Sequence, residues 1–396
     1  MPERYIYLDH AATTPTDPRV VEAMLPFFTE RFGNPSSIHR YGRTALEALD
    51  DARETVAAVL GVGRKEIIFT GGGSEADNLA IKGVAFAQRK AGKGAHIITS
   101  AIEHHAVLHA VEYLQAWGFE ITMLPVDSHG LISPDALQDA IRPDTVLVTL
   151  MYANNEIGTI QPLAELGVIC RARGVPLHTD AVQAAGSLSL RVDELHVDLL
   201  TIAAHKFYGP KGVGALYVRH GTPLLPQVNG GGQERQRRAG TENIPGIVGL
   251  ATALQLAEER RESYAAQCTA LRDRLIAGVL ERIPYASLNG HPTQRLPNNA
   301  NIAFDFVEGE SVLLLLDQHG IAASSGSACT SGSLEASHVL QAIGLPYEQA
   351  IGSVRFSVGK DTTAEDVDYV LDVLPPLIER LRSVSPAYRE TTMQSM

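Results

Sequence analysis

Polar side chains gather at the ends of five short apolar runs in the first half of the chain. The five clusters are Thr70–Glu75, Glu103–His105, Asn154–Glu156, His178–Gln183 and Ala204–Lys206. Parallel sheets bind ligands at the carboxyl ends of their strands. If the runs are strands of one parallel sheet, we expect the clusters to converge on a single site.

Within these clusters, Asp180 and Lys206 suit the cofactor pyridoxal phosphate. Its aldehyde needs a lysine that forms a Schiff base, and its ring nitrogen needs a carboxylate that keeps it protonated. Lys206 follows the small, apolar run Ile202–Ala204, where desolvation favours the neutral amine that attacks a carbonyl. A surface lysine at a turn is the alternative interpretation. We favour the cofactor because Asp180 and a glycine-rich loop call for the same ligand.

The glycine-rich loop Gly71–Gly73 precedes a helical pattern. Backbone N–H groups at a helix N-terminus, together with the hydroxyl of Ser74, can hold a phosphate, although the loop alone is equally compatible with a flexible turn. His104 has a ring that can stack on the pyridine of the cofactor. A histidine at a strand end is, however, more often a hydrogen-bonded cap.

The elements that must position these residues follow an α/β pattern. Between about residues 45 and 220, apolar runs alternate with amphipathic helical stretches, as in a mainly parallel sheet covered by helices on both faces. The predicted strands are Glu66–Thr70, His96–Ser100, Val146–Met151, Val175–Thr179, Leu199–Ala203 and Gly214–Val218. A Gly-Pro-Lys-Gly turn precedes the last of them, so we expect that strand to run antiparallel.

A smaller α+β domain is predicted to follow the sheet. Residues from Gly246 to about Ile283 have helical periodicity without an internal proline. The later elements are expected at Ile302–Phe306 (strand), Gly309–Gly320 (helix), Ser353–Ser357 (strand) and from there to Val384 (helix). The polar residues 385–396 are expected to fray. We therefore predict a large cofactor-binding domain over 13–262 and a small domain composed of 1–12 and 263–396.

Composition and charge restrict the class of function. The 396 residues, 45% of them apolar, exceed what one core usually holds, so two domains are expected. A formal net charge of −12 disfavours direct nucleic-acid binding. No apolar segment approaches membrane-spanning length, and no signal sequence opens the chain. Three scattered cysteines predict neither a disulfide framework nor a metal site, which favours the reducing cytoplasm.

Motifs spread over nearly the whole chain resemble those of one enzyme family. They are Tyr7–Thr14, Gly33–Ser37, Glu103–His105, Asn154–Gly158, Asp180–Gln183, His205–Gly212, Arg238–Asn243 and Ser324–Gly332. With them the chain resembles a class V, fold-type I pyridoxal-phosphate enzyme, and within that class a cysteine desulfurase of the nitrogen-fixation and iron–sulfur-cluster type. The resemblance implies a mainly parallel seven-stranded sheet and the conversion of L-cysteine to L-alanine.

The resemblance also implies which residues hold the cofactor ring. Lys206 would form the Schiff base, and His104 would stack on the ring and assist catalysis. Asp180 would pair with the ring nitrogen, Gln183 would contact the ring hydroxyl, and Asn155 would lie beside the cofactor. These roles agree with those inferred from the residue types for Lys206, Asp180 and His104.

The phosphate of the cofactor has its own implied partners. Gly73, Ser74 and His205 would hold it, and Thr241 would reach it from the second subunit of a homodimer. The chain departs from the family pattern at two positions. Ser74 stands where many relatives have threonine, which keeps the hydroxyl. Ala203 stands where many have a serine, which removes one phosphate donor.

Substrate binding is implied for residues elsewhere in the chain. Arg355 matches the family arginine that clamps the α-carboxylate of the substrate, a task suited to its two-pronged guanidinium. Asn155 and Asn34 would assist. Without the resemblance, a structural salt bridge is the simpler interpretation of Arg355.

Cys329 separates a desulfurase from other enzymes of this class. Cys170 and Cys268 lie in helical patterns and are expected to be inert and buried. Residues Ser324–Ser333 around Cys329 are nearly all small, so we expect a loop that can swing. The Cys329 thiolate would attack the substrate sulfur and carry it as a persulfide to an acceptor protein.

Three other functions remain open at this point. An aminotransferase or a selenocysteine lyase of the same class would use the same cofactor, and an inactive scaffold subunit could bind it without turnover. The acceptor is equally open, because an iron–sulfur scaffold, transfer-RNA thiolation and DNA sulfur modification all consume persulfide sulfur.

Overall fold

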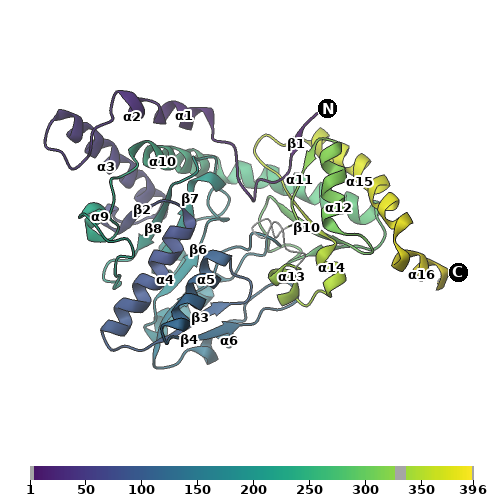
Figure 1. Cartoon of the computed structure of the whole chain (residues 1–396), viewed down its shortest axis with the longest axis horizontal. Helices are drawn as coiled ribbons and strands as arrows, with labels where there is room; N and C mark the ends of the chain where they lie inside the picture. Colours follow the sequence, from purple (N-terminus) through teal and green to yellow (C-terminus); the bar gives the residue numbers. More distant parts are fainter. Residues whose placement is uncertain (1–3, 326–335, 395–396) are drawn as a thin grey trace.

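A seven-stranded sheet forms the centre of the larger part of the molecule (Figure 1). The computed structural model describes residues 4–325 and 336–394. In spatial order the strands are β2 (Ile67–Thr70), β8 (Gly214–Val218), β7 (Leu199–Ala203), β6 (Leu177–Asp180), β5 (Thr145–Thr149), β3 (His96–Ser100) and β4 (Glu120–Leu124). Strand β8 pairs antiparallel with both neighbours, and the ladders from β7 to β4 are parallel. The predicted α/β fold and the antiparallel return strand are confirmed.

Strand β4 is the one member of this sheet that the apolar pattern does not predict. It lies at the edge of the sheet, and its residues Glu120 and Met123 are exposed. An edge strand can face water, so its sequence need not form an apolar run. The other six strands were expected, and β3, β7 and β8 have the predicted bounds.

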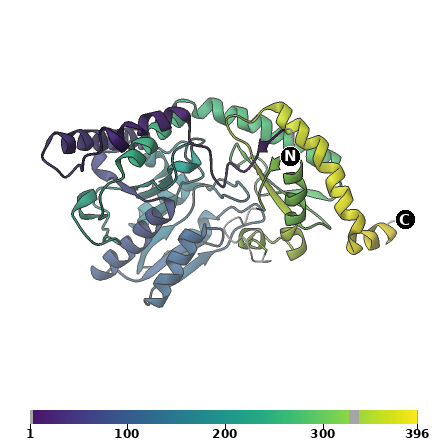
Figure 2. The same ribbon diagram turned by 45° about the horizontal axis from the view of Figure 1, so that its top comes forward.

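Helices cover both faces of this sheet (Figure 2). They are α1 (Pro18–Met24), α2 (Pro26–Thr29), α3 (Arg40–Leu60), α4 (Gly73–Lys90), α5 (His105–Ala116), α6 (Pro134–Ala140), α7 (Leu163–Arg173), α8 (Val192–Leu195), α9 (Gln233–Gln236) and α10 (Ile244–Glu259), with 3₁₀ turns η1 (Arg64–Glu66) and η2 (Ala204–Lys206). Successive side chains of β2 point to opposite faces of the sheet, and both faces are covered by apolar residues. Ile67 and Phe69 join one apolar cluster, and Ile68 joins another.

A smaller unit lies beside the sheet, on the right in Figure 1. Its antiparallel sheet has β10 (Asn299–Phe304) between β9 (Ala286–Asn289) and β12 (Ser353–Ser357). Its helices are α11 (Arg261–Arg282), α12 (Gly309–Gln318), α13 (His338–Ala342), α14 (Tyr347–Ile351), α15 (Ala364–Val384) and α16 (Pro386–Gln394). The N-terminal strand β1 (Ile6–Tyr7) pairs with β11 (Ile321–Ala322), and Leu8 joins the core of this unit. The domain boundaries near residues 12 and 262 stay a prediction.

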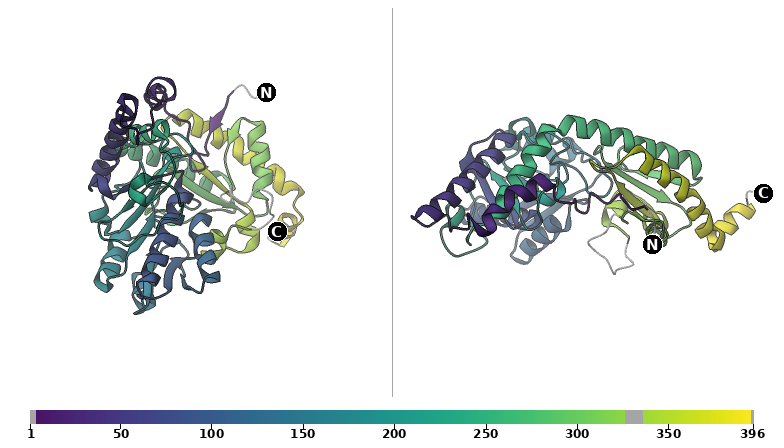
Figure 3. Two further views of the ribbon diagram at one scale, coloured as in Figure 1. Left: turned by 60° about the vertical axis from the view of Figure 1, so that its left-hand side comes forward. Right: turned by 90° about the horizontal axis from the view of Figure 1, so that it is seen from above.

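The stretch of predicted helical periodicity from Gly246 to Ile283 is helical and is divided into two helices, α10 and α11, which meet at Arg260 with φ −106° and ψ 3° (Figure 3). No proline or glycine marks that break. The tail expected to fray forms α16, because the ring of Tyr388 packs 5.5 Å from that of Phe306. Among the described residues, no helix is both long enough and apolar enough to cross a bilayer.

Candidate active site

Lys206 lies at the carboxyl edge of the large sheet, where β7 passes into η2. Its Nζ atom donates to the carbonyl oxygens of Ala11 at 2.5 Å and Ala12 at 2.8 Å. Gln183, which follows β6, donates to the Ala11 carbonyl at 2.9 Å. We call residues 9–13 the N-terminal strap, because this segment closes over the strand ends. The strap therefore holds two predicted cofactor ligands together.

Asp180 ends β6 and is buried at the same edge. Its Oδ1 accepts a hydrogen bond from the backbone of Val182 at 2.9 Å. Burial raises the pKa of Asp180, and the neighbouring His104 and Lys206 oppose that increase. A ligand that brings a positive charge would keep this carboxylate ionised. A protonated pyridine nitrogen is such a ligand, so Asp180 fits its predicted role.

His104 is the N-cap residue of α5. Its Nδ1 accepts a hydrogen bond from the backbone of Ala106 at 3.1 Å. Burial lowers the pKa of His104, although the nearby Asp180 acts in the opposite direction. In the neutral ring, the proton must then be on Nε2. His104 thus offers a flat, uncharged ring with one N–H donor.

The glycine-rich loop leads from β2 into α4. Gly72, the N-cap residue, has φ 152°, a conformation that side chains rarely allow. A Cβ on Gly73 would lie 3.0 Å from Val182 Cγ2, so the loop packs closely against the end of β6. The first-turn N–H groups of α4 have no intrahelical partner, and Ser74 is exposed beside them. The loop therefore has the donors that a phosphate needs.

His205 connects the strap to the turn that carries Lys206. Its Nδ1 lies 3.1 Å from Thr13 Oγ1, and its carbonyl accepts hydrogen bonds from the backbone and hydroxyl of Thr14. Burial lowers the pKa of His205 to about 4. At neutral pH this ring is therefore uncharged and can donate one ring N–H.

Arg355 lies in the middle of β12, in the smaller unit. It is 2% exposed. Its Nη1 donates to the backbone carbonyl of Asn155 at 2.9 Å, and its Nη2 donates to Asp9 Oδ1 at 2.9 Å. The smaller unit thus brings a buried guanidinium to the strap and to the end of the loop after β5.

A layer of buried polar residues lies behind Asp180. The sequence analysis included His178 in one of its clusters but did not identify Asp77. His178 contacts Thr149 Oγ1 at 2.8 Å and Thr201 Oγ1 at 3.1 Å, and its Nε2 lies 3.6 Å from Asp77 Oδ1. Burial lowers the pKa of His178 to about 3 and raises that of Asp77. The available signal was an acidic residue, Asp77, within the apolar stripe of the α4 pattern.

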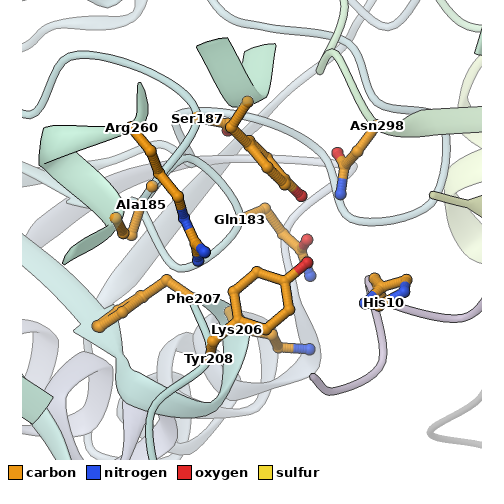
Figure 4. A pocket seen from close by; sticks show the side chains of 12 residues that line it. His10, Gln183, Ala185, Ser187, Lys206, Phe207, Tyr208, Arg260 and Asn298 are labelled. Carbon is orange, nitrogen blue, oxygen red and sulfur yellow. The ribbon is translucent and has the colours of Figure 1, made fainter. Parts of the chain in front are cut away.

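A pocket opens beside Lys206, as Figure 4 shows. Gln183, Tyr208 and Arg260 line it from the large sheet and from the start of α11. His10 lines it from the strap, and its buried Nδ1 has no hydrogen-bond partner among the described residues. The pocket is therefore polar on the side of the strap.

Two of the predicted site residues that the structure describes, Thr241 and Asn34, are not brought into this arrangement. Thr241 is exposed, and Asn34 lies in a surface turn where its Oδ1 accepts the backbone N–H of Ser36 at 2.9 Å. Cys329 lies outside the described residues. Cys170 and Cys268 are buried free thiols as expected, and burial raises the pKa of Cys268 to about 11. The roles of Thr241, Asn34 and Cys329 stay predictions.

Comparison with known proteins identifies the family. Residues 6–370 match the family described as aminotransferase class-V. The chain belongs to that family. A relative in Methanosarcina thermophila, named cysteine desulfurase IscS, is 56% identical over 381 residues, which cover 96% of this chain and 94% of that protein.

Solved structures of class-V aminotransferase relatives have the same fold. A NifS-like protein superposes with a TM-score of 0.89 at 39% identity and covers 95% of this chain and 100% of that one. A structure described as SspA in complex with cysteine has a TM-score of 0.79 at 38% identity and covers 90% of this chain and 100% of that one. The expected family and fold are confirmed.

Proposed function

We propose that the protein is a pyridoxal-phosphate-dependent cysteine desulfurase that converts L-cysteine to L-alanine. The meeting of Lys206 and Asp180 under the N-terminal strap supports the cofactor. The 56% identity to a protein named cysteine desulfurase IscS supports the reaction, and so does the likeness to a structure of SspA with cysteine. No other activity has comparable support.

Five residues are proposed to hold the cofactor ring. Asp180 would bind the ring nitrogen, Gln183 the ring hydroxyl, and His104 the ring face, with Asn155 beside it and Lys206 bonded to the aldehyde carbon. When bound, the cofactor supplies an electron sink for the bond that breaks at the α-carbon of the substrate. Because burial raises the pKa of Asp180, a protonated ring nitrogen beside it would favour its ionised form.

The phosphate would lie at the N-terminus of α4. Gly73 supplies backbone N–H, Ser74 a hydroxyl, and the neutral His205 a ring N–H. Ala203 contributes no donor there. Thr241 would complete this shell from a second subunit.

The substrate would bind between the two units. Arg355 would hold the α-carboxylate, with Asn155 and Asn34 nearby. Lys206, once released from its carbonyl partners in the strap, would remove the α-proton. The thiolate of Cys329 would then take the sulfur atom and carry it as a persulfide to an acceptor protein, such as an iron–sulfur scaffold.

We propose a homodimer located in the cytoplasm. Several large apolar side chains between α1 and the start of α3 are exposed, which is typical of a protein–protein contact. They include Leu25, Phe28, Phe32, Ile38 and Tyr41. The free thiols of Cys170 and Cys268 suit a reducing compartment.

The proposed reaction makes two products that can be measured together. The purified protein, given L-cysteine and a reductant, should release alanine and sulfide in equal amounts. Cys329→Ala should release neither at a significant rate, and Lys206→Ala should be colourless. The absence of alanine from L-cysteine alone, or formation of alanine that requires a keto acid and survives Cys329→Ala, would favour an aminotransferase. Faster turnover of L-selenocysteine by Cys329→Ala would favour a selenocysteine lyase.

A further inference from the structure

Arg355 has two hydrogen-bond partners and a buried Nε donor that neither of them uses. Its Nη2 donates to Asp9 and its Nη1 to the backbone of Asn155, each at 2.9 Å. Its Nε is buried and has no hydrogen-bond partner among the described residues. Buried donors are rarely left unpaired in folded proteins. The guanidinium can therefore donate to a further acceptor while it is already paired with a carboxylate.

Asp9 is held against Arg355 by its backbone. Its carbonyl accepts N–H groups from Ala12 at 3.0 Å and Thr13 at 3.5 Å, and it forms a bridge to Ser357 in β12. Its side chain is 20% exposed, so the ion pair is only partly screened by water. Asp9 thus places a carboxylate permanently within reach of Arg355.

Among the described residues, Glu156 is another acidic group that interacts electrostatically with Arg355. Glu156 is buried, and burial raises its pKa, whereas Arg355 acts to lower it. Its Oε2 accepts a hydrogen bond from the hydroxyl of Ser337, not from the guanidinium. Among the described residues, Asp9 is therefore the carboxylate that directly contacts Arg355.

We propose that Asp9 sets the affinity of the site for carboxylate ligands by competing with them for Arg355. The proposal rests on the proposed function, in which Arg355 binds the α-carboxylate of the substrate. A guanidinium that is already paired with one anion attracts a second anion less strongly. Asp9 weakens binding of L-cysteine and of L-alanine alike, because both present the same carboxylate, and so it favours product release.

Asp9→Asn tests this competition, because the amide keeps the shape and one acceptor oxygen but removes the charge. Two probes separate the groups of the substrate: 3-mercaptopropionate has the thiol and carboxylate without the amine, and cysteamine has the amine and thiol without the carboxylate. Titration calorimetry of the holoenzyme should show 3-mercaptopropionate binding about fivefold more tightly to the variant, the factor expected for one partly exposed ion pair. Cysteamine affinity should be unchanged, and the KM for L-cysteine should fall.

Two control variants make the outcome interpretable. Arg4→Gln removes another ion pair of the N-terminal segment, with Asp366, and should leave both affinities unchanged. Arg355→Gln should abolish the preference for 3-mercaptopropionate over the carboxylate-free probe. If Arg355→Gln keeps that preference, Arg355 does not bind the substrate carboxylate, and the proposed function is wrong on this point regardless of the result for Asp9→Asn.

A different pair of results would contradict the proposed competition between Asp9 and carboxylate ligands. If Arg355→Gln loses the preference but Asp9→Asn binds 3-mercaptopropionate with equal or lower affinity, Asp9 does not compete for the guanidinium. Asp9→Ser provides a second neutral variant if Asp9→Asn folds poorly by thermal melting. Asp9→Ser should also bind 3-mercaptopropionate about fivefold more tightly than the wild type does.

Discussion

Burial, more than ion pairing, sets the protonation states of the residues behind the site. It lowers the pKa of His178 to about 3 and that of His205 to about 4, and it raises the pKa of Glu103 to about 8. Both histidines are therefore neutral at pH 7. Burial also raises the pKa of Asp180, whereas the neighbouring His104 and Lys206 act to lower it, so the charge of this carboxylate depends on its cationic neighbours.

The low pKa of His178 predicts a loss of stability in acid. The unfolded state takes up a proton near pH 6.5, whereas the folded state does so only near pH 3, so the contribution of His178 is complete above pH 6.5 and falls with decreasing pH. Between pH 7 and pH 5, the free energy of unfolding should fall by about 2 kcal/mol more in the wild type than in His178→Gln. Urea titrations at the two pH values measure this difference. Equal losses would mean that folding does not lower the pKa of His178.

At the scale of elements, the short helix α9 is strained. Glu234, Arg235 and Gln236 have φ values of 43°, 56° and 64°, a left-handed conformation that costs non-glycine residues about 1 kcal/mol or more each. Arg53 holds the turn with two hydrogen bonds of 2.7 Å to the carboxylate of Glu234, and Phe69 donates to the same carboxylate. Sequence patterns give no signal for this turn, because its partners lie in α3 and β2.

Loss of the buried pair should therefore destabilise the protein. Glu234→Gln leaves Arg53 buried without its counter-charge and should lower the free energy of unfolding by about 3 kcal/mol. The exposed pair of Arg274 and Asp368 is a matched control, and Asp368→Asn should cost less than about 1 kcal/mol. Adding Arg53→Met to Glu234→Gln should cost less than the sum of the single changes. Strict additivity, measured by urea denaturation, would show that the two side chains do not act as a pair.

At the scale of the whole molecule, the site is shared between two units. The large sheet provides Lys206 and Asp180, and the smaller unit provides Arg355. The N-terminal strap joins them, since it bonds to Lys206 through Ala11 and to Arg355 through Asp9. A change that shifts one unit relative to the other should therefore alter the proposed cofactor contacts and the proposed substrate contacts together.

The proposed dimer can be tested at its exposed apolar surface. Ile38 is 92% exposed, and Ile38→Asp should convert a dimer into monomers and weaken cofactor binding, because Thr241 would no longer reach the second site. Light scattering after gel filtration measures the mass, and a cofactor titration measures the affinity. Leu314, 63% exposed on α12, provides the control, and Leu314→Asp should remain dimeric. A monomeric wild type would contradict the dimer directly.

The sequence by itself determined the α/β architecture, the strand ends that carry Asp180 and Lys206, and the family. Those features are local: a strand, its last residues and the following turn are contiguous, so periodicity and residue type reveal them. Only the tertiary structure decided that Asp9 pairs with Arg355, 346 residues away, and that Asp77 lies behind Asp180. It also decided that the helical stretch after Gly246 is interrupted at Arg260. These outcomes depend on how distant elements pack, and no local pattern encodes that packing.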